Sequence, residues 1–275
     1  MKKTTFLIIS MLTALAISFS SATAQDIKPS GETIGHDKEG NAVYQIDSNG
    51  IRIGYKLIGS GEPLVMIVGL GSTMDLWPKE VIDALSKKYQ LILLDNRGMG
   101  HTTVNDVTFT YKLFADDVVG LLDILKVEKT NVLGFSMGST ITQELLLEYP
   151  QRFNKAIIYA TSTDGSNVAA TLKGKAPLGE SSINPIVLRQ IEATTHWKTP
   201  LDKLPYITNQ VMFIVGTSDT VVGVESSRTL ASAIPGAWLV QFKNGSHGLM
   251  IEAPAVFARI VLDFLEINET VEVKQ

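Results

Sequence analysis

The sequence contains no cysteine, so disulfide bonds do not stabilise the fold. A chain of 275 residues can bury a sizeable core without them, so this absence is compatible with an oxidising compartment. It also excludes a lipid anchor on cysteine and thiolate metal ligands. The four histidines are scattered, and no spacing of histidines and carboxylates resembles a ligand set. We therefore expect neither a metal nor a cofactor.

Runs of basic residues are missing as well. The formal net charge is −4, and removal of the first 24 residues would leave 22 cationic against 28 acidic side chains, or −6. This charge argues against nucleic acids and anionic membrane surfaces as partners. A small-molecule partner remains the better expectation.

No apolar run is long enough to cross a bilayer comfortably, but a shorter one lies at the N-terminus. Lys2 and Lys3 precede about 14 apolar residues at 6–19, and Ala22-Thr23-Ala24 forms an A-x-A cleavage site. We predict a signal peptide at 1–24 and a bacterial protein exported to the periplasm or beyond. No stable membrane anchor is expected after cleavage. The alternative is an uncleaved N-terminal anchor.

Beyond this segment, short apolar runs alternate with helical patterns. Residues 25–41 are polar and predict a flexible lead-in, and residues 269–275 a C-terminal tail. The expected strands are 43–47, 51–58, 64–68, 91–94, 131–134, 156–160, 212–215 and 238–242. The expected helices are 79–88, 113–126, 138–149, 224–234 and 254–266. This order predicts one α/β domain over 42–268, with a mostly parallel sheet of about eight strands and helices on both faces. Residues 163–208 interrupt it, with one helix expected at about 184–196.

The segment Gly134-Phe135-Ser136-Met137-Gly138 joins an expected strand to an expected helix. In this setting G-x-S-x-G forms a sharp, strained turn that lifts the serine hydroxyl above the sheet edge. Glycine is needed two residues before and two after the serine, because the chain approaches itself closely there. Ser136 is therefore the candidate nucleophile.

An acid and a base follow two later strands. Asp219 lies just past the strand at 212–215, and His247 lies just past the strand at 238–242, between small residues. Loops at the carboxyl ends of parallel strands are where open α/β sheets place their active residues. Asp164, which follows the strand at 156–160, is the rival candidate for the acid. Asp219 and His247 are the expected partners of Ser136.

The loop after the strand at 64–68 contains Gly69-Leu70-Gly71. Its two glycines allow backbone N–H groups to turn toward a bound oxyanion. The expected donors are the N–H groups of Leu70 and Met137, the latter directly after the nucleophile. The same loop, with Asp95 after the next strand, also resembles a dinucleotide-binding unit. A dinucleotide-binding unit would need a third glycine where Met74 stands. It would also give no role to Ser136, Asp219 and His247.

Together these residues resemble the α/β-hydrolase superfamily, in its single-domain esterase-like branch, over about residues 40–268. The matching segments are Gly69-Leu70-Gly71, Asp95-Asn96-Arg97-Gly98-Met99-Gly100, Gly134 to Gly138, Asp219, and Ser246 to Pro254 around His247. The order serine, acid, histidine is also that of the family. One departure is Val68, which stands where the family often has histidine. The resemblance implies an α/β-hydrolase fold and a small cap at 163–208.

The resemblance also implies an activity. We expect a serine hydrolase, a carboxylesterase in type, that cleaves a small-molecule ester or related acyl compound through an acyl-enzyme. Trp77 and Phe135 are expected to contact the substrate. The same triad also serves C–C bond hydrolysis, removal of N-terminal residues from peptides, acyl transfer and cofactor-free perhydrolysis. A ligand-binding sensor without catalysis is a further alternative on the same fold.

Overall fold

The protein is described by a computed structural model that covers residues 26–175 and 184–267. The predicted signal peptide at 1–24 and tail at 269–275 lie outside the described residues, as do residues 176–183 of the predicted cap. Within the described ranges, every helix is too short or too polar to span a membrane.

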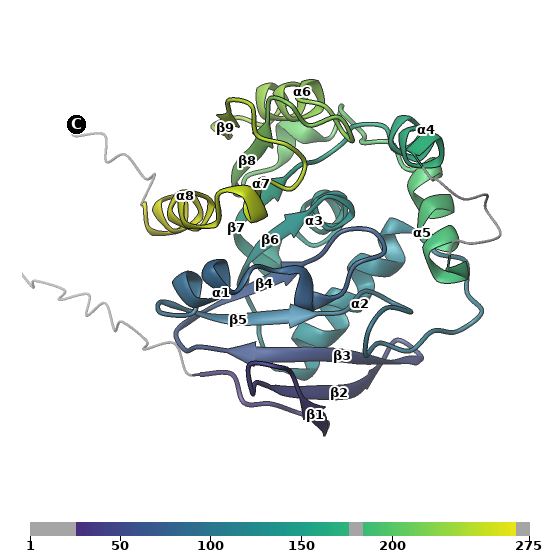
Figure 1. Ribbon diagram of the computed structural model, residues 1–275, viewed down its shortest axis with the longest axis vertical. Helices are drawn as coiled ribbons and strands as arrows, with labels where there is room; N and C mark the ends of the chain where they lie inside the picture. Colours follow the sequence, from purple (N-terminus) through teal and green to yellow (C-terminus); the bar gives the residue numbers. More distant parts are fainter. Residues whose placement is uncertain (1–25, 176–183, 268–275) are drawn as a thin grey trace, which may run out of the picture.

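A single nine-stranded sheet runs through the molecule in the order β1-β2-β3-β5-β4-β6-β7-β8-β9 (Figure 1). Its strands are β1 (Glu32–His36), β2 (Ala42–Ser48), β3 (Ile51–Ile58), β4 (Glu62–Ile67), β5 (Tyr89–Leu94), β6 (Thr130–Phe135), β7 (Phe153–Tyr159), β8 (Gln210–Gly216) and β9 (Trp238–Phe242). Pairing is antiparallel from β1 to β5 and parallel from β5 to β9. The predicted α/β class and mostly parallel sheet are confirmed.

The strand beyond the expected eight is β1, which lies within the segment predicted as a flexible lead-in. It pairs with β2 at the edge of the sheet, and all five of its residues are exposed. The prediction is wrong for this part of 25–41. An edge strand without a buried face needs no alternation of apolar and polar residues, so the pattern at Glu32–His36 gave no signal.

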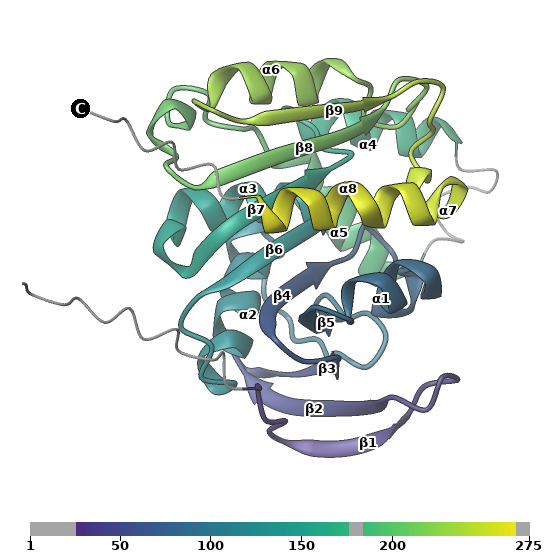
Figure 2. The ribbon, with the colours of Figure 1, turned by 90° about the vertical axis from the view of Figure 1, so that its left-hand side faces the viewer.

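Helices cover both faces of the sheet, as predicted. They are α1 (Lys79–Leu85), α2 (Tyr111–Ile124), α3 (Met137–Glu148), α4 (Gly165–Lys175), α5 (Pro185–His196), α6 (Glu225–Ala233), α7 (Leu249–Glu252) and α8 (Pro254–Glu266), with 3-10 turns η1 (Met74–Leu76), η2 (Pro150–Arg152) and η4 (Leu204–Tyr206). Side by side, α1 and α8 cover one face (Figure 2), and α2, α3 and α6 pack on the other.

The sheet separates two hydrophobic cores. Along β4, Val65 and Ile67 belong to the core beneath α2 and α3, whereas Leu64 and Met66 belong to the core beneath α1 and α8. Successive side chains of a strand point to opposite faces, so a strand covered on both faces must be apolar throughout. This explains why the central strands appear in the sequence as continuous apolar runs.

The carboxyl ends of the parallel strands all point toward one side of the molecule, where α4 and α5 lie (Figure 1). These two helices pack against each other within the predicted cap. The sequence predicted a helix close to α5 but none at α4, whose weak apolar pattern and Gly174 conceal it. The side of the sheet that carries the candidate residues is thus covered by two helices.

Candidate active site

Ser136 stands on a sharp turn between β6 and α3. Its backbone has φ 53° and ψ −116°, a strained combination for a residue with a Cβ atom. A Cβ at Gly134 would come within 2.2 Å of the Gly138 oxygen, and one at Gly138 within 2.1 Å of the Ile67 oxygen. Only glycine fits at both positions, so the motif folds as its residue types predict. The turn leaves Ser136 at the N-terminus of α3, at the carboxyl edge of the sheet.

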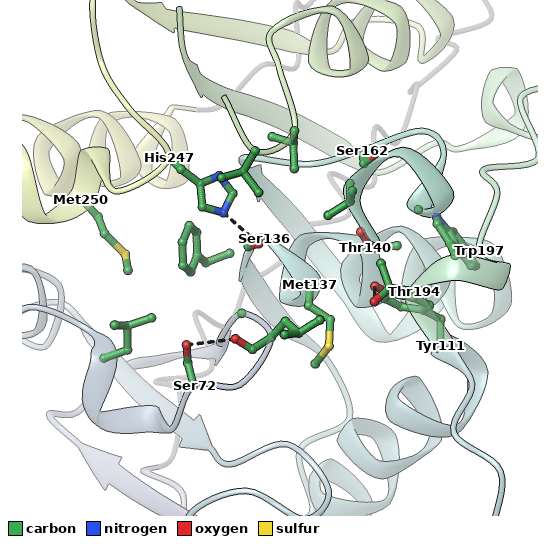
Figure 3. Close-up of a pocket in the computed structure, with 18 of the residues that line it drawn as sticks. Ser72, Tyr111, Ser136, Met137, Thr140, Ser162, Thr194, Trp197, His247 and Met250 are labelled. Carbon is green, nitrogen blue, oxygen red and sulfur yellow. Dashed lines mark hydrogen bonds between the residues drawn. The ribbon is translucent and has the colours of Figure 1, made fainter. Parts of the chain in front are cut away.

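His247 joins Ser136 to Asp219 in a row of hydrogen-bonded side chains. Asp219 follows the end of β8 by three residues, and His247 follows the end of β9 by five. His247 Nε2 lies 3.0 Å from Ser136 Oγ (Figure 3), and His247 Nδ1 lies 2.8 Å from Asp219 Oδ2. The structure therefore brings the three predicted groups together from the ends of β6, β8 and β9.

The Asp219 carboxylate is fully buried and well partnered. Its Oδ1 accepts hydrogen bonds from the N–H groups of Val221 at 2.8 Å and Val222 at 3.1 Å. Burial raises the pKa of Asp219, but the hydrogen bond and charge of His247 and the two N–H groups outweigh it, leaving the pKa below its usual value. An ionised Asp219 holds the imidazole proton on Nδ1 and leaves Nε2 free to accept from Ser136.

Asp164, the rival acid, has other partners. Its Oδ1 accepts from the N–H of Ser166 at 2.9 Å and the Ser166 hydroxyl at 2.6 Å. Its Oδ2 lies 3.2 Å from Lys198 Nζ. Asp164 thus stands at the start of α4, and it is Asp219 that contacts the imidazole of His247.

The loop that carries His247 is fixed from below by Tyr159, a residue that the sequence did not single out. Its hydroxyl donates to the His247 carbonyl oxygen at 2.6 Å, and its ring stacks on Phe135 at 4.9 Å between centroids. Phe135 in turn contacts the His247 ring at 5.1 Å. Burial raises the pKa of Tyr159, so the phenol stays protonated and able to donate. In the sequence, Tyr159 is indistinguishable from a core residue of β7.

The loop after β4 lies against the nucleophile. A Cβ at Gly69 would lie 3.1 Å from Ser136 Cβ, and Leu70 and Met137 line the same pocket as Ser136. In the described part of the chain, neither the Leu70 N–H nor the Met137 N–H donates to another protein group. Both are therefore available to a ligand. The loop runs into η1, and α1 begins only at Lys79, so it lacks the immediate helix of a dinucleotide site.

The pocket beside Ser136 has a volume of about 310 Å³ and mostly apolar walls. Phe135 lines it. Trp77 does not: only 4% of it is exposed, and it packs edge-on against Phe135 at 6.5 Å between ring centroids. The structure thus gives no support to the prediction that Trp77 contacts the substrate. Within the described ranges, no group of three or more histidine and acidic side chains is arranged to hold a metal ion.

Comparison with solved structures shows the same fold. The enol-lactonase of Burkholderia xenovorans LB400 superposes with a TM-score of 0.70 at 24% sequence identity, over 81% of this chain and 100% of that one. A family model described as alpha/beta hydrolase fold matches residues 62–177. The chain therefore has the α/β-hydrolase fold.

Relatives of this chain carry the names of several enzymes. The 2-hydroxymuconate semialdehyde hydrolase of Pseudomonas sp. (strain CF600) is 24% identical over 265 residues, covering 80% of this chain and 93% of that protein. The putative non-heme bromoperoxidase BpoC of Mycobacterium tuberculosis is 36% identical over 112 residues, 40% of this chain and 42% of that protein. The chain is thus similar to proteins whose names describe different reactions.

The α/β-hydrolase motifs located the candidate reacting groups but not the polar part of the pocket wall. The hydroxyls of Tyr111, Thr140 and Thr194 gather at one end of the pocket, next to Trp197 (Figure 3). These residues come from α2, α3, α5 and the segment after α5, without a common spacing. The only signal in the sequence was the presence of hydroxyl groups on otherwise apolar helix faces.

Proposed function

We propose that this α/β hydrolase is a serine hydrolase that cleaves a small carboxylic ester, or a related acyl compound, through a covalent acyl-enzyme. The observation that carries the proposal is the hydrogen-bonded row from Ser136 Oγ through His247 to Asp219. Two N–H groups without protein partners, those of Leu70 and Met137, line the same pocket. A nucleophile, a base, an acid and oxyanion donors in one place are what acyl transfer requires.

In the proposed mechanism, His247 Nε2 takes the proton of Ser136 as Oγ attacks the substrate carbonyl carbon. Asp219 stabilises the imidazolium that forms. The N–H groups of Leu70 and Met137 bind the oxyanion of the tetrahedral intermediate, each contributing roughly 3–4 kcal/mol. His247 then protonates the leaving alcohol, and a second cycle with water releases the acid and frees Ser136.

The size and walls of the pocket support a small acyl substrate. A volume of about 310 Å³ lies at the lower end of the range for ligand pockets, about 300–1,000 Å³. The relatives named as a semialdehyde hydrolase and a putative bromoperoxidase favour C–C hydrolysis and perhydrolysis as second candidates, since both reactions can use the same groups. A substrate panel separates them: ester hydrolysis releases an alcohol and an acid, C–C hydrolysis releases no alcohol, and perhydrolysis consumes hydrogen peroxide and releases a peracid.

The location is also a proposal. The A-x-A site after a short apolar run supports export from a bacterial cell and cleavage before Gln25. N-terminal sequencing of protein recovered from the periplasm or medium would find Gln25 first. A retained Met1 on membrane-bound protein would contradict export in this form.

The first test is covalent labelling of the nucleophile. A fluorophosphonate incubated with the purified protein is expected to form one adduct per chain, on Ser136, because Oγ is activated by His247. The Ser136→Ala variant should take no label and hydrolyse no p-nitrophenyl ester, with thermal stability nearly unchanged. Mass spectrometry of the digested protein locates the adduct.

A matched control is Ser232→Ala, which removes an exposed serine hydroxyl on α6, away from the pocket. It should label and turn over like the wild type. Full ester hydrolysis by Ser136→Ala would refute the proposal.

A further inference from the structure

We propose that the acyl half of the substrate carries a hydrogen-bond-accepting oxygen at its far end, near its fourth carbon, and that Trp197 binds this oxygen. The inference deepens the proposed function and rests on it, because it assigns the acyl group to one end of the pocket. It distinguishes a γ-oxygenated acyl group from a plain alkyl chain of the same size.

The far end of the pocket is a polar corner in an otherwise apolar cavity, formed by Tyr111, Thr140, Thr194 and Trp197. Tyr111 is buried, and its Oη lies 3.1 Å from Thr194 Oγ1. Its ring packs against Trp197 at 5.1 Å between centroids. Four polar side chains from separate elements thus meet where an apolar wall would be enough to hold an alkyl chain.

The protons of the polar corner can be assigned one by one. Thr194 donates its only hydroxyl proton to the Gln190 carbonyl at 2.8 Å, so it accepts from Tyr111. Burial raises the pKa of Tyr111 to about 12, so the phenol keeps the proton that it donates. The side chain of Thr140 faces the same corner and acts to lower the pKa of Tyr111, against the larger effect of burial. The hydroxyl protons of Tyr111 and Thr194 therefore both have acceptors within the protein.

Trp197 is the exception in the polar corner. Its indole Nε1 is buried and has no hydrogen-bond partner among the described residues. An indole N–H can only donate, and leaving such a group buried and unpaired costs about 1–3 kcal/mol. An oxygen acceptor on the ligand would remove this cost. The unpaired group thus favours substrates that bring an acceptor to this end.

The placement of the reacting groups decides which half of the substrate reaches the polar corner. His247 and Met250 lie on one side of Ser136, and the polar corner lies on the other (Figure 3). The leaving group must stay near His247, which protonates it, so the acyl chain extends toward Thr140 and Trp197. Thr140 lies one helical turn beyond Ser136, about 6 Å along α3. A substituent on the fourth carbon of the acyl chain spans that distance.

The test compares two esters of the same shape, p-nitrophenyl 4-oxopentanoate and p-nitrophenyl 4-methylpentanoate. They differ only in an oxygen that replaces a methyl group on the fourth carbon. With rates divided by those of hydroxide-catalysed hydrolysis, the wild type should favour the oxo ester on the order of tenfold in kcat/KM. In Trp197→Phe, which keeps the ring but removes the N–H, this preference should fall to near one.

The matched control is Trp238→Phe, which removes an indole N–H from β9 outside the pocket, where the ring packs on Phe264. It should keep the wild-type preference. The ratio of kcat/KM for the two esters in the wild type tests the preference for an acyl oxygen even if Trp197→Phe does not fold. Equal rates for the two esters in a wild type whose turnover depends on Ser136 would overturn this inference and leave the proposed function standing. No Ser136-dependent turnover of either ester, with no fluorophosphonate adduct, would overturn the proposed function itself.

A preference that survives in folded Trp197→Phe would overturn the assignment to Trp197. Product inhibition gives an independent reading. Free 4-oxopentanoate should inhibit more strongly than 4-methylpentanoate in the wild type and about equally in the variant.

Discussion

At the scale of single residues, the neighbours of a carboxylate decide what it can do. Asp219 and Asp164 both follow strands at the carboxyl edge, and sequence alone could not separate them completely. In the structure, Asp219 is buried and bonded to His247, while Asp164 binds Ser166 and Lys198. The difference comes from side-chain contacts made across the fold, which a local pattern does not contain.

This difference leads to a direct comparison of two variants. Asp219→Asn should lower kcat by roughly 10⁴-fold, because an amide no longer holds the His247 proton on Nδ1. Asp164→Asn should change kcat only slightly, since it loses contacts with Ser166 and Lys198 alone. Steady-state kinetics on a p-nitrophenyl ester measure both. A larger loss in Asp164→Asn would mean that the acid is misassigned.

Ser136 was the most predictable residue, because its motif follows from steric contacts close to it in the chain. Gly134 and Gly138 are required by contacts within a few residues of Ser136, so the sequence contains the whole argument. The pocket walls were less predictable. Trp77 lies near the oxyanion loop in sequence, but its side chain packs against Phe135 and does not line the pocket. Trp197 lies far from the motif, and the fold brings it into the pocket.

At the scale of elements, helix α5 is tied to the loop that carries Leu70. The fully buried Gln190 of α5 accepts a hydrogen bond at its Oε1 from the Gly71 N–H, at 2.8 Å. Oxyanion donors must be aimed before the charge develops, so their loop has to be held in place. Gln190 is therefore a positioning residue that connects the covering helices to the candidate oxyanion hole.

We expect Gln190→Leu to lower kcat on the order of tenfold with little change in KM, because the donor geometry matters most in the transition state. Gln143→Leu is the matched control. It removes a buried amide on α3 that bonds Thr161, Ser162 and Thr199 but not the loop with Leu70. If both variants lose stability equally and kcat equally, Gln190 has only a structural role.

Some helices and strands were easier to predict from the sequence than others. Strands β4 to β8 are covered on both faces, so burial alone makes them apolar, and their positions were predicted closely. Helix α4 and strand β1 have exposed or weakly apolar faces. Strand β1 is held by pairing with β2, and helix α4 is held by packing against α5. The periodicity of a single sequence does not encode either contact.

At the scale of the whole molecule, Lys56 joins distant parts of the chain. Its ammonium group is almost fully buried on β3 and pairs with Asp37, after β1, and with Asp75 in η1, just beyond the oxyanion loop. Burial raises the pKa of Asp37, but the hydrogen bonds from Lys56 and Asn41 outweigh it and lower the pKa to about 2. The edge of the sheet is thus connected electrostatically to the region of the site.

This pKa predicts an acid-sensitive contribution to stability. The folded pKa of Asp37 is about 2 and the ordinary value is 3.8, so its stabilisation is present above pH 4 and is lost as the pH falls toward 2. Asp37→Asn should remove about 2 kcal/mol of pH-dependent unfolding free energy over that window. Urea unfolding at a series of pH values measures it. Asp83→Asn, in an exposed pair with Lys79, should keep the wild-type slope, and an unchanged slope in Asp37→Asn would contradict the assignment.

The contact between Ser136 and His247 has a consequence for how activity returns on refolding. The two residues are 111 positions apart, and their contact needs β6, β8 and β9 to be aligned in one sheet. Contacts of such long range form late, because the chain must close a large loop first. An intermediate with β1 to β7 paired but β8 and β9 undocked would have native-like secondary structure and no functional site. Recovered hydrolysis therefore reports the docking of β8 and β9, and the circular dichroism signal would recover before it.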